Sequence, residues 1–549
     1  MSDSIRTFAR RYFLLFCIIL AAVVRLVYLS QLPFGFHNDE VAAGYVGRYM
    51  FLHGGIDISG HRFPLYFDTF GDFRPIGIFL LSGISTFFFG VNEFAVRFPS
   101  TFFGILTVIP LYLLCIRLFK NRTIALLAAL FLAVSPWHVV LSRATSEGVI
   151  GLFFMLSGLV CLVYFGDSHS LKPALLAVIL LGLSYFYYHS FRVLVPLVVA
   201  PFYFYPKLSS WQKKTILAIF FLFSGLTIAF SLTKAGSGRL NQVLFTNSSE
   251  VTNRIALFTQ GEGPNHAFTA RIFHNKVVVY TREFLRLYAD YFSPSFLFSQ
   301  GGFPDRYVVP DVGLFPWIFV ILLGAGGIVI FTNRSFANNL LIWLLCISPL
   351  PAAVTTDDTP NVHRALSLMI PLIIVSAIGG VTILKALYKR KSQLTLLVVG
   401  FFLLFTAETV YFWHQYAVHE QGYKSFYRND MFREMVEKVA NVHSAYDTVY
   451  VSEYDGIPLY YLFYTNTFNI PYSSFSYGGI IKKLGNIEFV DDWCPTRVKK
   501  YDANGKNVLY VNKGDCPMDN EHKILETMDQ HDGARAFQFV VEIIPQAKE

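Results

Sequence analysis

Charged residues are scarce in this chain of 549 residues. Asp, Glu, Lys and Arg make up 15% of it and hydrophobic residues 54%, whereas about a quarter of a soluble domain is charged. The deficit excludes an ordinary soluble domain. Apolar runs recur between residues 12 and 413, and many are long enough to cross a hydrocarbon core of about 30 Å. The sequence therefore predicts a polytopic membrane protein whose first partner is the lipid bilayer.

A concentrated basic tract is also missing. The net charge of +8 comes largely from Lys and Arg residues in short loops between apolar runs, which is the distribution that sets membrane orientation. We therefore expect no nucleic-acid partner. The first apolar run is long, and no small-residue cleavage site follows it, so we do not expect a cleavable signal peptide.

Cysteine is rare, and no pair of the six cysteines has the spacing of metal ligands. Cys494 and Cys516 lie in the polar C-terminal region, where they could form a disulfide if that region faces an oxidising compartment. We expect no metal site and no cofactor. The other four lie inside apolar runs and are predicted to be buried thiols: Cys17, Cys115, Cys161 and Cys346.

Eleven apolar runs are predicted to span the membrane, and a twelfth is treated separately. The run 76–90 is short, and if it spanned, the basic loops that follow would alternate to the wrong side of the membrane. We predict a juxtamembrane or re-entrant segment there, with a short tilted span as the alternative. The predicted spans are 12–30, 96–116, 123–141, 148–165, 173–188, 192–206, 215–233, 312–331, 338–354, 364–384 and 393–413.

The basic loops predict that the N-terminus is cytoplasmic. The first loop, 31–95, then lies outside, as do the large loop 234–311 and everything after residue 413. We expect the large loop to cover a cavity, with aromatic residues that contact sugar or lipid or lie in the membrane interface. The predicted division is a membrane domain, 1–413, and an extracytoplasmic domain, 414–549.

The composition changes after residue 413 and predicts a small α/β domain. Residues 429–442 carry apolar side chains at helical spacing, with Asn429 or Asp430 as the cap. Residues 522–530 are also predicted to be helical. Three segments alternate or run apolar like strands: 447–453, 506–513 and 536–543. The fold class predicted is an all-α polytopic membrane protein with this C-terminal α/β domain.

An adjacent acidic pair, Asp39 and Glu40, stands in "FGFHNDEVAAGY" just after the first apolar run. Ionisable residues near a membrane are costly and tend to be functional. The residues that follow predict an interfacial helix with one apolar side. Asp39 then either caps this helix or acts as a general base at the mouth of a membrane cavity.

Several cations lie on the same predicted side of the membrane. Arg74 precedes Pro75 at the lip of the run 76–90 and either snorkels to lipid headgroups or binds a phosphate. Arg364, which follows His363 at the start of a span, calls for an anionic ligand or a carboxylate partner. Glu147 begins another span, either in a loop ion pair or as part of a helix start.

The order of these motifs resembles the bacterial family 39 glycosyltransferases. The stretches "HNDEVAAGYVGRYMFLHGG" and "FRPIGIFLLSGISTFFFGVNEFAVRFPSTFF" are similar to the N-terminal half of that family, and "SRATSEGVIGLFF" and "NVHRALSLMIP" are similar to later segments. The family includes relatives of protein O-mannosyltransferases and of the lipid A aminoarabinose transferase, and its members share the GT-C fold.

The resemblance implies a bacterial plasma-membrane enzyme. It would transfer a sugar from a polyprenyl-phosphate donor to a hydroxyl acceptor outside the cytoplasm, on protein, lipid or glycan, with inversion. By position, Asp39 matches the catalytic acid, Glu40 lies beside it, and Glu147 matches a second acidic position that is often Asp. The expected lipid-phosphate contacts are Arg74, Arg97, His363 and Arg364, with a structural role as the alternative for Arg97 and Arg364.

Two other functions fit part of the pattern. A transporter or flippase of lipid-linked sugars would explain the spans and the charges near the membrane, but it needs no acidic pair ahead of a helix. Transporters also often carry inverted repeats, which the sequence lacks. A scaffold whose C-terminal domain binds partners is the second alternative.

Overall fold

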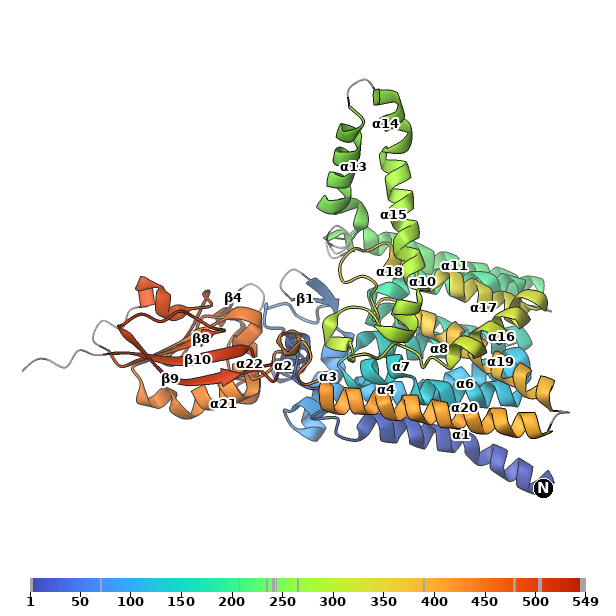
Figure 1. The fold of residues 1–549 in the computed structure, drawn as a ribbon, viewed down its shortest axis with the longest axis horizontal. Helices are drawn as coiled ribbons and strands as arrows, with labels where there is room; N and C mark the ends of the chain where they lie inside the picture. Colours follow the sequence, from blue (N-terminus) through green and yellow to red (C-terminus); the bar gives the residue numbers. More distant parts are fainter. Residues whose placement is uncertain are drawn as a thin grey trace, which may run out of the picture. The chain divides into compact units, whose positions relative to one another are not determined.

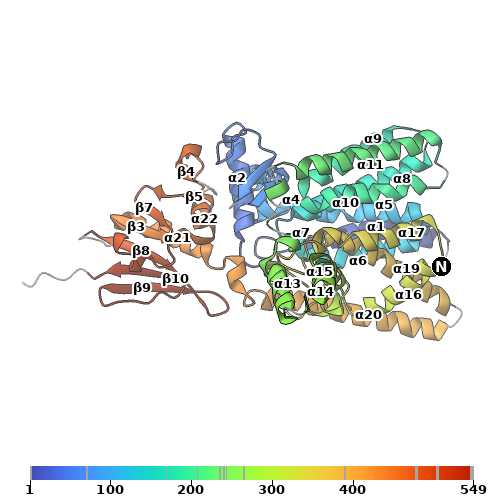
Figure 2. The ribbon, with the colours of Figure 1, turned by 90° about the horizontal axis from the view of Figure 1, so that it is seen from above.

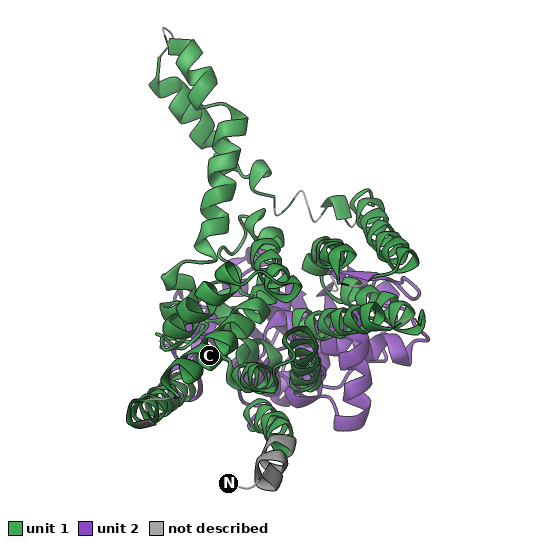
Figure 3. Ribbon diagram, turned by 90° about the vertical axis from the view of Figure 1, so that its right-hand side faces the viewer, with its two compact units in different colours: residues 1–27, 100–142, 146–415 green, residues 28–99, 143–145, 416–549 purple. Residues whose placement is uncertain are grey.

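The chain divides into two compact units (Figure 3). Unit 1 comprises residues 1–27, 100–142 and 146–415, and unit 2 comprises residues 28–99, 143–145 and 416–549. This division differs from the predicted boundary at residue 413, because most of the first loop groups with the C-terminal region. The computed structural model describes residues 3–69, 72–168, 170–206, 208–233, 236–238, 242, 244–263, 266–388, 391–476, 480–501 and 506–543.

Unit 1 is built of helices, as its long apolar runs require. Backbone polar groups in a bilayer must be satisfied within the segment, and a helix does this. The helices are α1 (Asp3–Leu26), α4 (Glu93–Leu106, which begins in unit 2), α5 (Val108–Phe119), α6 (Arg122–Val134), α7 (Pro136–Arg143), α8 (Glu147–Asp167), α9 (Lys172–Tyr187), α10 (His189–Val199), α11 (Ser210–Ser231), α13 (Ser249–Gly261), α14 (Ala267–Phe273), α15 (Lys276–Asp290), α16 (Phe319–Thr332), α17 (Phe336–Ile347), α18 (Leu350–Ala353), α19 (Met369–Leu387) and α20 (Lys391–His414).

Six helical segments in the described residues are long and apolar enough to cross a membrane. A seventh candidate is the pair α6 and α7, which bends by 51° at Ser135. Five shorter apolar helices accompany them, and one of these, α3 (Gly77–Phe89), occupies the run that we set apart from the spans. Each of the eleven predicted spans coincides with one of the other helical segments, while the count of eleven crossings stays a prediction.

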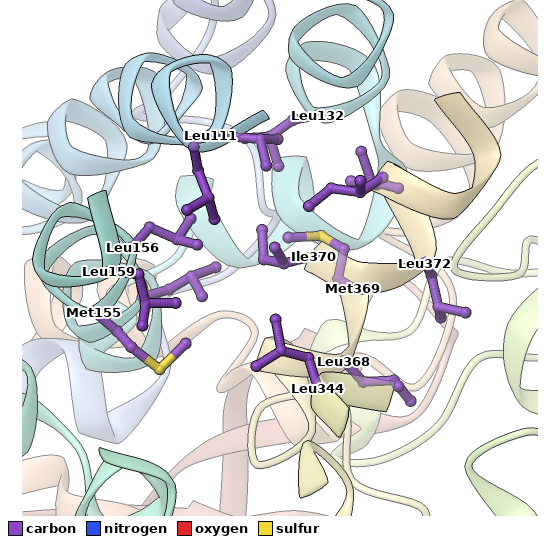
Figure 4. Packing of buried hydrophobic residues seen from close by; sticks show 14 of the residues in the cluster. Leu111, Leu132, Met155, Leu156, Leu159, Leu344, Leu368, Met369, Ile370 and Leu372 are labelled. Carbon is purple, nitrogen blue, oxygen red and sulfur yellow. The ribbon is translucent and has the colours of Figure 1, made fainter. Parts of the chain in front are cut away.

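The core of unit 1 lies where α5, α6, α8 and α19 meet (Figure 4). Leu111, Leu132, Leu156 and Ile373 are each fully buried there. Of the cysteines predicted to be buried, Cys17 and Cys115 are, whereas Cys161 is half-buried and Cys346 is exposed. The prediction was wrong for Cys346 because its run is a span with one side open to the surroundings.

The first loop folds into helices and a hairpin within unit 2. These elements are α2 (Asn38–Leu52), β1 (Tyr66–Thr69), β2 (Asp72–Pro75) and α3. We predicted an interfacial position for α2, but its side chains from Glu40 to Gly47 are buried on every side. Gly47 and Gly83 explain the burial, because a Cβ atom at Gly47 would lie 1.9 Å from the carbonyl oxygen of Phe79. The two glycines let α2 and α3 approach closely.

The C-terminal part of unit 2 is a six-stranded sheet, with strand order β6-β7-β3-β8-β10-β9 (Figure 2). Strand β3 runs parallel to β7 and β8, and the other pairs are antiparallel. Helices α21 (Phe432–Val442) and α22 (Ile457–Tyr464) pack against each other and the sheet. The strands are β3 (Thr448–Ser452), β6 (Lys483–Leu484), β7 (Ile487–Val490), β8 (Val508–Lys513), β9 (His522–Asp529) and β10 (Arg535–Glu542), with a separate pair β4 (Phe475–Ser476) and β5 (Ile480–Ile481).

The three predicted strands are confirmed as β3, β8 and β10, but the helix predicted at 522–530 was wrong. This segment is the edge strand β9, paired with β10 along its length. The predicted cap of α21 was also wrong, since the helix begins at Phe432 after Met431 in a left-handed conformation. Cys494 and Cys516 form a disulfide, with Cα atoms 5.8 Å apart.

Candidate functional site

Helix α2 presents the acidic pair from its first turn. The N-cap is His37, and not Asp39 as one reading of the sequence suggested: His37 Nδ1 accepts a hydrogen bond from the Asp39 amide at 3.1 Å. The Glu40 carboxylate accepts from the His37 amide in return, at 3.3 Å, which completes a capping box. Since His37 performs the capping, the Asp39 carboxylate is not needed for it.

Glu40 is enclosed by hydrogen-bond donors. Its Oε1 atom accepts from Arg97 Nε at 3.1 Å and from the amide and hydroxyl of Thr145 at 3.1 and 3.0 Å. Its Oε2 atom accepts from Arg97 Nη2 at 3.0 Å, and the side chain is 8% exposed. Burial alone would raise the pKa of Glu40, but the charge of Arg97 and these hydrogen bonds outweigh it and lower the pKa below its usual 4.5. Glu40 is therefore a buried structural anion.

Asp39 has a different environment, although it is the next residue. Its Oδ1 atom lies 2.9 Å from Arg74 Nη1, and its side chain is 29% exposed. Arg74 extends from β2, opposite Phe67 in the β1–β2 hairpin, and its guanidinium lies 5.6 Å from the ring centre of Phe79. The hairpin thus brings together a partly exposed carboxylate and a cation that were 35 residues apart in the sequence.

Two buried guanidinium groups hold the loop before α2. Besides Glu40, Arg97 donates to the carbonyl groups of Leu29 (3.3 Å), Ser30 (3.4 Å), Pro33 (3.0 Å) and Gly35 (2.5 Å), and Arg143 donates to those of Tyr28 (3.2 Å) and Leu32 (3.1 Å). All three nitrogen atoms of Arg97 are engaged and its side chain is fully buried. This favours the structural reading of Arg97 over a contact with lipid phosphate.

A second set of contacts to this loop comes from the C-terminal region of unit 2, which the sequence did not indicate. Glu420 accepts from the Phe34 amide at 3.2 Å and pairs with Arg428. Asn429 Oδ1 accepts from the Asn38 amide at 3.1 Å. The partners are almost 400 residues apart, so no local pattern could have identified them. They fix the entry to α2 and hence the position of Asp39.

In unit 1, Glu147 is the first residue of α8 and is buried, with Ser146 as the N-cap. His363 Nε2 lies 2.8 Å from Ser146 Oγ and accepts from the Gly148 amide at 3.2 Å. A Cβ atom at Gly148 would lie 2.5 Å from Nε2. His363 therefore contacts the N-cap and the first turn of α8, which favours a structural role over the predicted phosphate contact.

Arg364 has a carboxylate partner, which was one of the two explanations for its position. Its Nη2 atom lies 2.8 Å from Asp357 Oδ2, and Nη1 donates to Thr355 Oγ1 at 2.9 Å. The side chain is 11% exposed.

Of the seven predicted site residues, the structure brings four together in unit 2 (Asp39, Glu40, Arg74 and Arg97) and three in unit 1 (Glu147, His363 and Arg364). Among the described residues, no three His, Cys, Asp or Glu side chains gather as they would around a metal ion.

The fold defines a class: a mostly helical protein with several helices long and apolar enough to cross a membrane. The crystal structure of the apo oligosaccharyltransferase of Archaeoglobus fulgidus matches with a TM-score of 0.51, at 13% identity, over 93% of this chain and 70% of that chain. At this identity the likeness concerns the fold alone.

Sequence comparison relates the chain to a family within that class. Residues 73–233 match the family model described as dolichyl-phosphate-mannose-protein mannosyltransferase. Undecaprenyl phosphate-alpha-4-amino-4-deoxy-L-arabinose arabinosyl transferases also match. The one from Yersinia enterocolitica is 30% identical over 171 residues, or 30% of this chain and 29% of that protein. The one from Erwinia tasmaniensis is 31% identical over 148 residues, which are 26% of this chain and 25% of that protein. Over these segments the chain is similar to glycosyltransferases, and it matches less than a third of the length of these relatives.

Proposed function

We propose that this chain is a membrane glycosyltransferase that takes a sugar from a polyprenyl-phosphate carrier and transfers it to a hydroxyl acceptor outside the cytoplasm. The names of the matched relatives support a carrier of the undecaprenyl-phosphate class, and the family model supports a glycosyl transfer. The disulfide between Cys494 and Cys516 supports an oxidising compartment for the C-terminal region.

The observation that carries the proposal is the contrast between the two acidic neighbours. Glu40 accepts hydrogen bonds from three residues and is buried, so it has no capacity left for a substrate. Asp39 is partly exposed and lies 2.9 Å from the Arg74 guanidinium. A carboxylate that can reach a hydroxyl and a cation that can reach a phosphate are the two groups that this reaction needs.

In the proposed reaction, Asp39 accepts the proton of the acceptor hydroxyl as its oxygen attacks the anomeric carbon. The bond between that carbon and the phosphate oxygen breaks, and polyprenyl phosphate leaves with the electron pair. A single displacement inverts the anomeric centre. The leaving phosphate is already anionic and needs a cation rather than a proton, so Arg74 turns from Asp39 toward it. For Glu147 we propose a catalytic role only by its match to the second acidic position of the family motif.

The decisive experiment compares Asp39→Asn with Asp491→Asn in purified protein. Asp491 is an exposed residue of the same unit, so its variant controls for the substitution itself. We expect Asp39→Asn to lower release of undecaprenyl phosphate from an undecaprenyl-phosphate sugar by about 10²–10⁴-fold, the usual worth of a general base. Normal release by Asp39→Asn would overturn the role of Asp39. Movement of the intact lipid-linked sugar across vesicles without bond cleavage would support the flippase instead.

Arg74 allows an independent test of the phosphate contact. Binding of undecaprenyl phosphate itself is measured for Arg74→Ala and Arg74→Lys, since Lys keeps the charge but loses the planar fork of donors. We expect the Ala variant to bind most weakly and the Lys variant to be intermediate. Equal binding by all three proteins would remove Arg74 from the phosphate site.

A further inference from the structure

Three helices of unit 1, α13, α14 and α15, form an arm that projects away from the other helices (Figures 1 and 3). In Figure 1 the arm runs crosswise to the long helices α19 and α20 of the same unit, and in Figure 3, seen along those helices, it extends beyond their perimeter. We expected the loop 234–311 to cover a cavity, but this part of it points away from the other helices of unit 1.

The base of the arm is fixed at the edge of the membrane-spanning helices. Tyr291, which is fully buried, accepts from the Asn361 amide at 3.0 Å. Tyr288 donates to the carbonyl of Cys346, in the candidate span Phe336–Ala353, at 2.8 Å. Asn361 lies in the short connection between that span and the next, Leu366–Leu387, so it lies at a membrane surface. An arm that leaves there, crosswise to the spans, runs along the plane of the bilayer.

The interior of the arm contains an ion cluster. Glu283, whose side chain is 4% exposed, lies 2.6 Å from Arg286 and 2.9 Å from Arg254 on α13. The hydrogen bond from Arg286 lowers the pKa of Glu283 despite its burial. The buried apolar side chains of the three helices are aliphatic: Val251, Ala270, Val279 and Leu287.

The large apolar side chains of the arm lie on its outside. Phe268 is 76% exposed, Val277 75%, Leu257 66% and Phe273 60%. A helical hairpin surrounded by water would bury more of these large apolar side chains. Two further apolar side chains of α15 and of the residues just after it are exposed toward the base of the arm, Leu285 (56%) and Phe292 (37%). Exposed apolar side chains that recur along an element in this way are typical of a membrane or partner contact.

We propose that the arm lies flat on the bilayer, with its outer apolar side chains inserted among the lipids of the leaflet next to residues 355–363. Three observations select lipid rather than a protein partner: the direction of the arm along the membrane plane, its base at the membrane surface, and large exposed apolar side chains from the far end of the arm to its base. Basic residues at headgroup level and aromatic residues below it are typical of such interfacial helices. The arm carries both, and it extends the contact of the protein with the membrane beyond the perimeter of its spans.

The test attaches an NBD fluorophore to single cysteines in full-length protein in which Cys346 and Cys161 are replaced by Ser. The positions are Phe268→Cys and Val277→Cys, with Thr252→Cys, an exposed polar residue of α13, as the matched control. The protein is placed in nanodiscs of phosphatidylethanolamine and phosphatidylglycerol. We expect lipids with a doxyl quencher on the acyl chain to quench Phe268 and Val277 at least twofold more than Thr252, and aqueous iodide to show the opposite order.

Two outcomes overturn the proposal. Equal access of iodide to all three positions would mean that the arm extends into water. Disulfide crosslinking between two copies of Phe268→Cys in nanodiscs, with no lipid quenching, would mean that a second copy covers the arm. All three substitutions are at exposed positions, and gel filtration before reconstitution establishes that each labelled protein is folded.

Discussion

Asp39 and Glu40 differ in role because successive residues of a helix point in directions about 100° apart. From the first turn of α2, Glu40 points toward Arg97 and Thr145, whereas Asp39 points toward Arg74 on the hairpin. The same helix start therefore provides one buried carboxylate that holds the scaffold and one partly exposed carboxylate, to which we assign the proposed role in transfer. The two roles predict different consequences of mutation, on stability for Glu40 and on transfer for Asp39.

Glu40 predicts a dependence of stability on pH. Its pKa is lower in the folded protein than its usual 4.5, so its ionised form stabilises the fold above pH 4.5, and this contribution is lost as the pH falls through the folded pKa. Glu40→Gln leaves Arg97 buried without its anion, which costs about 3–5 kcal/mol. We expect the melting temperature of this variant to be lower than that of the unchanged protein at pH 7, and the gap to narrow below pH 4.5.

The milder variant Thr145→Val provides the control, because it removes one donor to Glu40 and keeps the charge pair. Its melting temperature is expected to fall by less at pH 7. Burial raises the pKa of Glu420 above its usual value, and this residue is unchanged in all three proteins. The prediction would be contradicted if the difference in melting temperature between the unchanged protein and Glu40→Gln stayed constant from pH 7 to pH 3.

His363 predicts a rescue by a conservative substitution. Its Nε2 atom accepts from the Gly148 amide at the start of α8, and Gln can place an amide oxygen at a similar reach, whereas Leu cannot. We expect His363→Leu to lower the free energy of unfolding by about 1–3 kcal/mol, the cost of a buried donor left unsatisfied, and His363→Gln to restore most of it. Thermal unfolding in detergent measures the stability of both variants. An equal loss of stability in His363→Leu and His363→Gln would mean that the packing of the ring, and not its hydrogen bond from the Gly148 amide, stabilises α8.

Sequence reasoning identified the candidate residues of the site better than their partners. Asp39, Arg74 and Arg364 could be chosen because charged side chains near apolar runs are costly and conspicuous. The cap at His37 and the donor at Thr145 could not, since His is an uncommon N-cap and Thr145 lies 105 residues from Glu40. Partners of this kind are set by tertiary contacts, which one sequence without its fold does not contain.

At the scale of elements, the crossing of α2 and α3 depends on Gly47 and Gly83. A methyl group at Gly47 would meet the Phe79 carbonyl at 1.9 Å, so the helices would have to separate. We expect Gly47→Ala to lower the free energy of unfolding by about 1–3 kcal/mol, as overpacking does. Gly182, in α9, is the matched control: nothing lies within 4 Å of its added Cβ, and Ala there should be neutral or stabilise by up to about 1 kcal/mol. Thermal unfolding of both variants in detergent measures this difference. An unchanged stability of Gly47→Ala would contradict the close approach of the two helices.

Two errors at this scale have one cause. The segment 522–530 has the composition of a helix, yet β10 offers it a pairing partner, and tertiary pairing overrides a weak local propensity. Its exposed charges suit an edge strand, where they oppose pairing with other chains. Likewise, the sequence predicts one apolar side for α2, whereas its residues from Glu40 to Gly47 are buried on every side, because α3 and α22 pack against it. Long apolar runs were the most predictable elements, since their length alone indicates a span.

At the scale of the whole molecule, the disulfide between Cys494 and Cys516 predicts both stability and sidedness. It closes a loop with a sequence separation of 22, and such a crosslink contributes about 2–4 kcal/mol, mostly by restricting the unfolded chain. We expect replacement of both cysteines by Ser to lower the stability of the C-terminal sheet by this amount, measured by proteolysis of the purified protein. The control is Cys17→Ser, at a thiol that forms no disulfide.

The same bond tests the orientation of the chain in the cell. A disulfide persists in the periplasm or outside the cell but is reduced in the cytosol, so the predicted orientation requires both cysteines to be oxidised in spheroplasts. In protein with Cys161 and Cys346 replaced by Ser, a membrane-impermeant maleimide should label nothing at first and two sites after mild reduction. If the C-terminal region were cytoplasmic, both thiols would be reduced and would react only after lysis. That result would reverse the orientation and place Asp39, which shares unit 2 with the disulfide, on the side of the membrane where the proposed acceptor is absent.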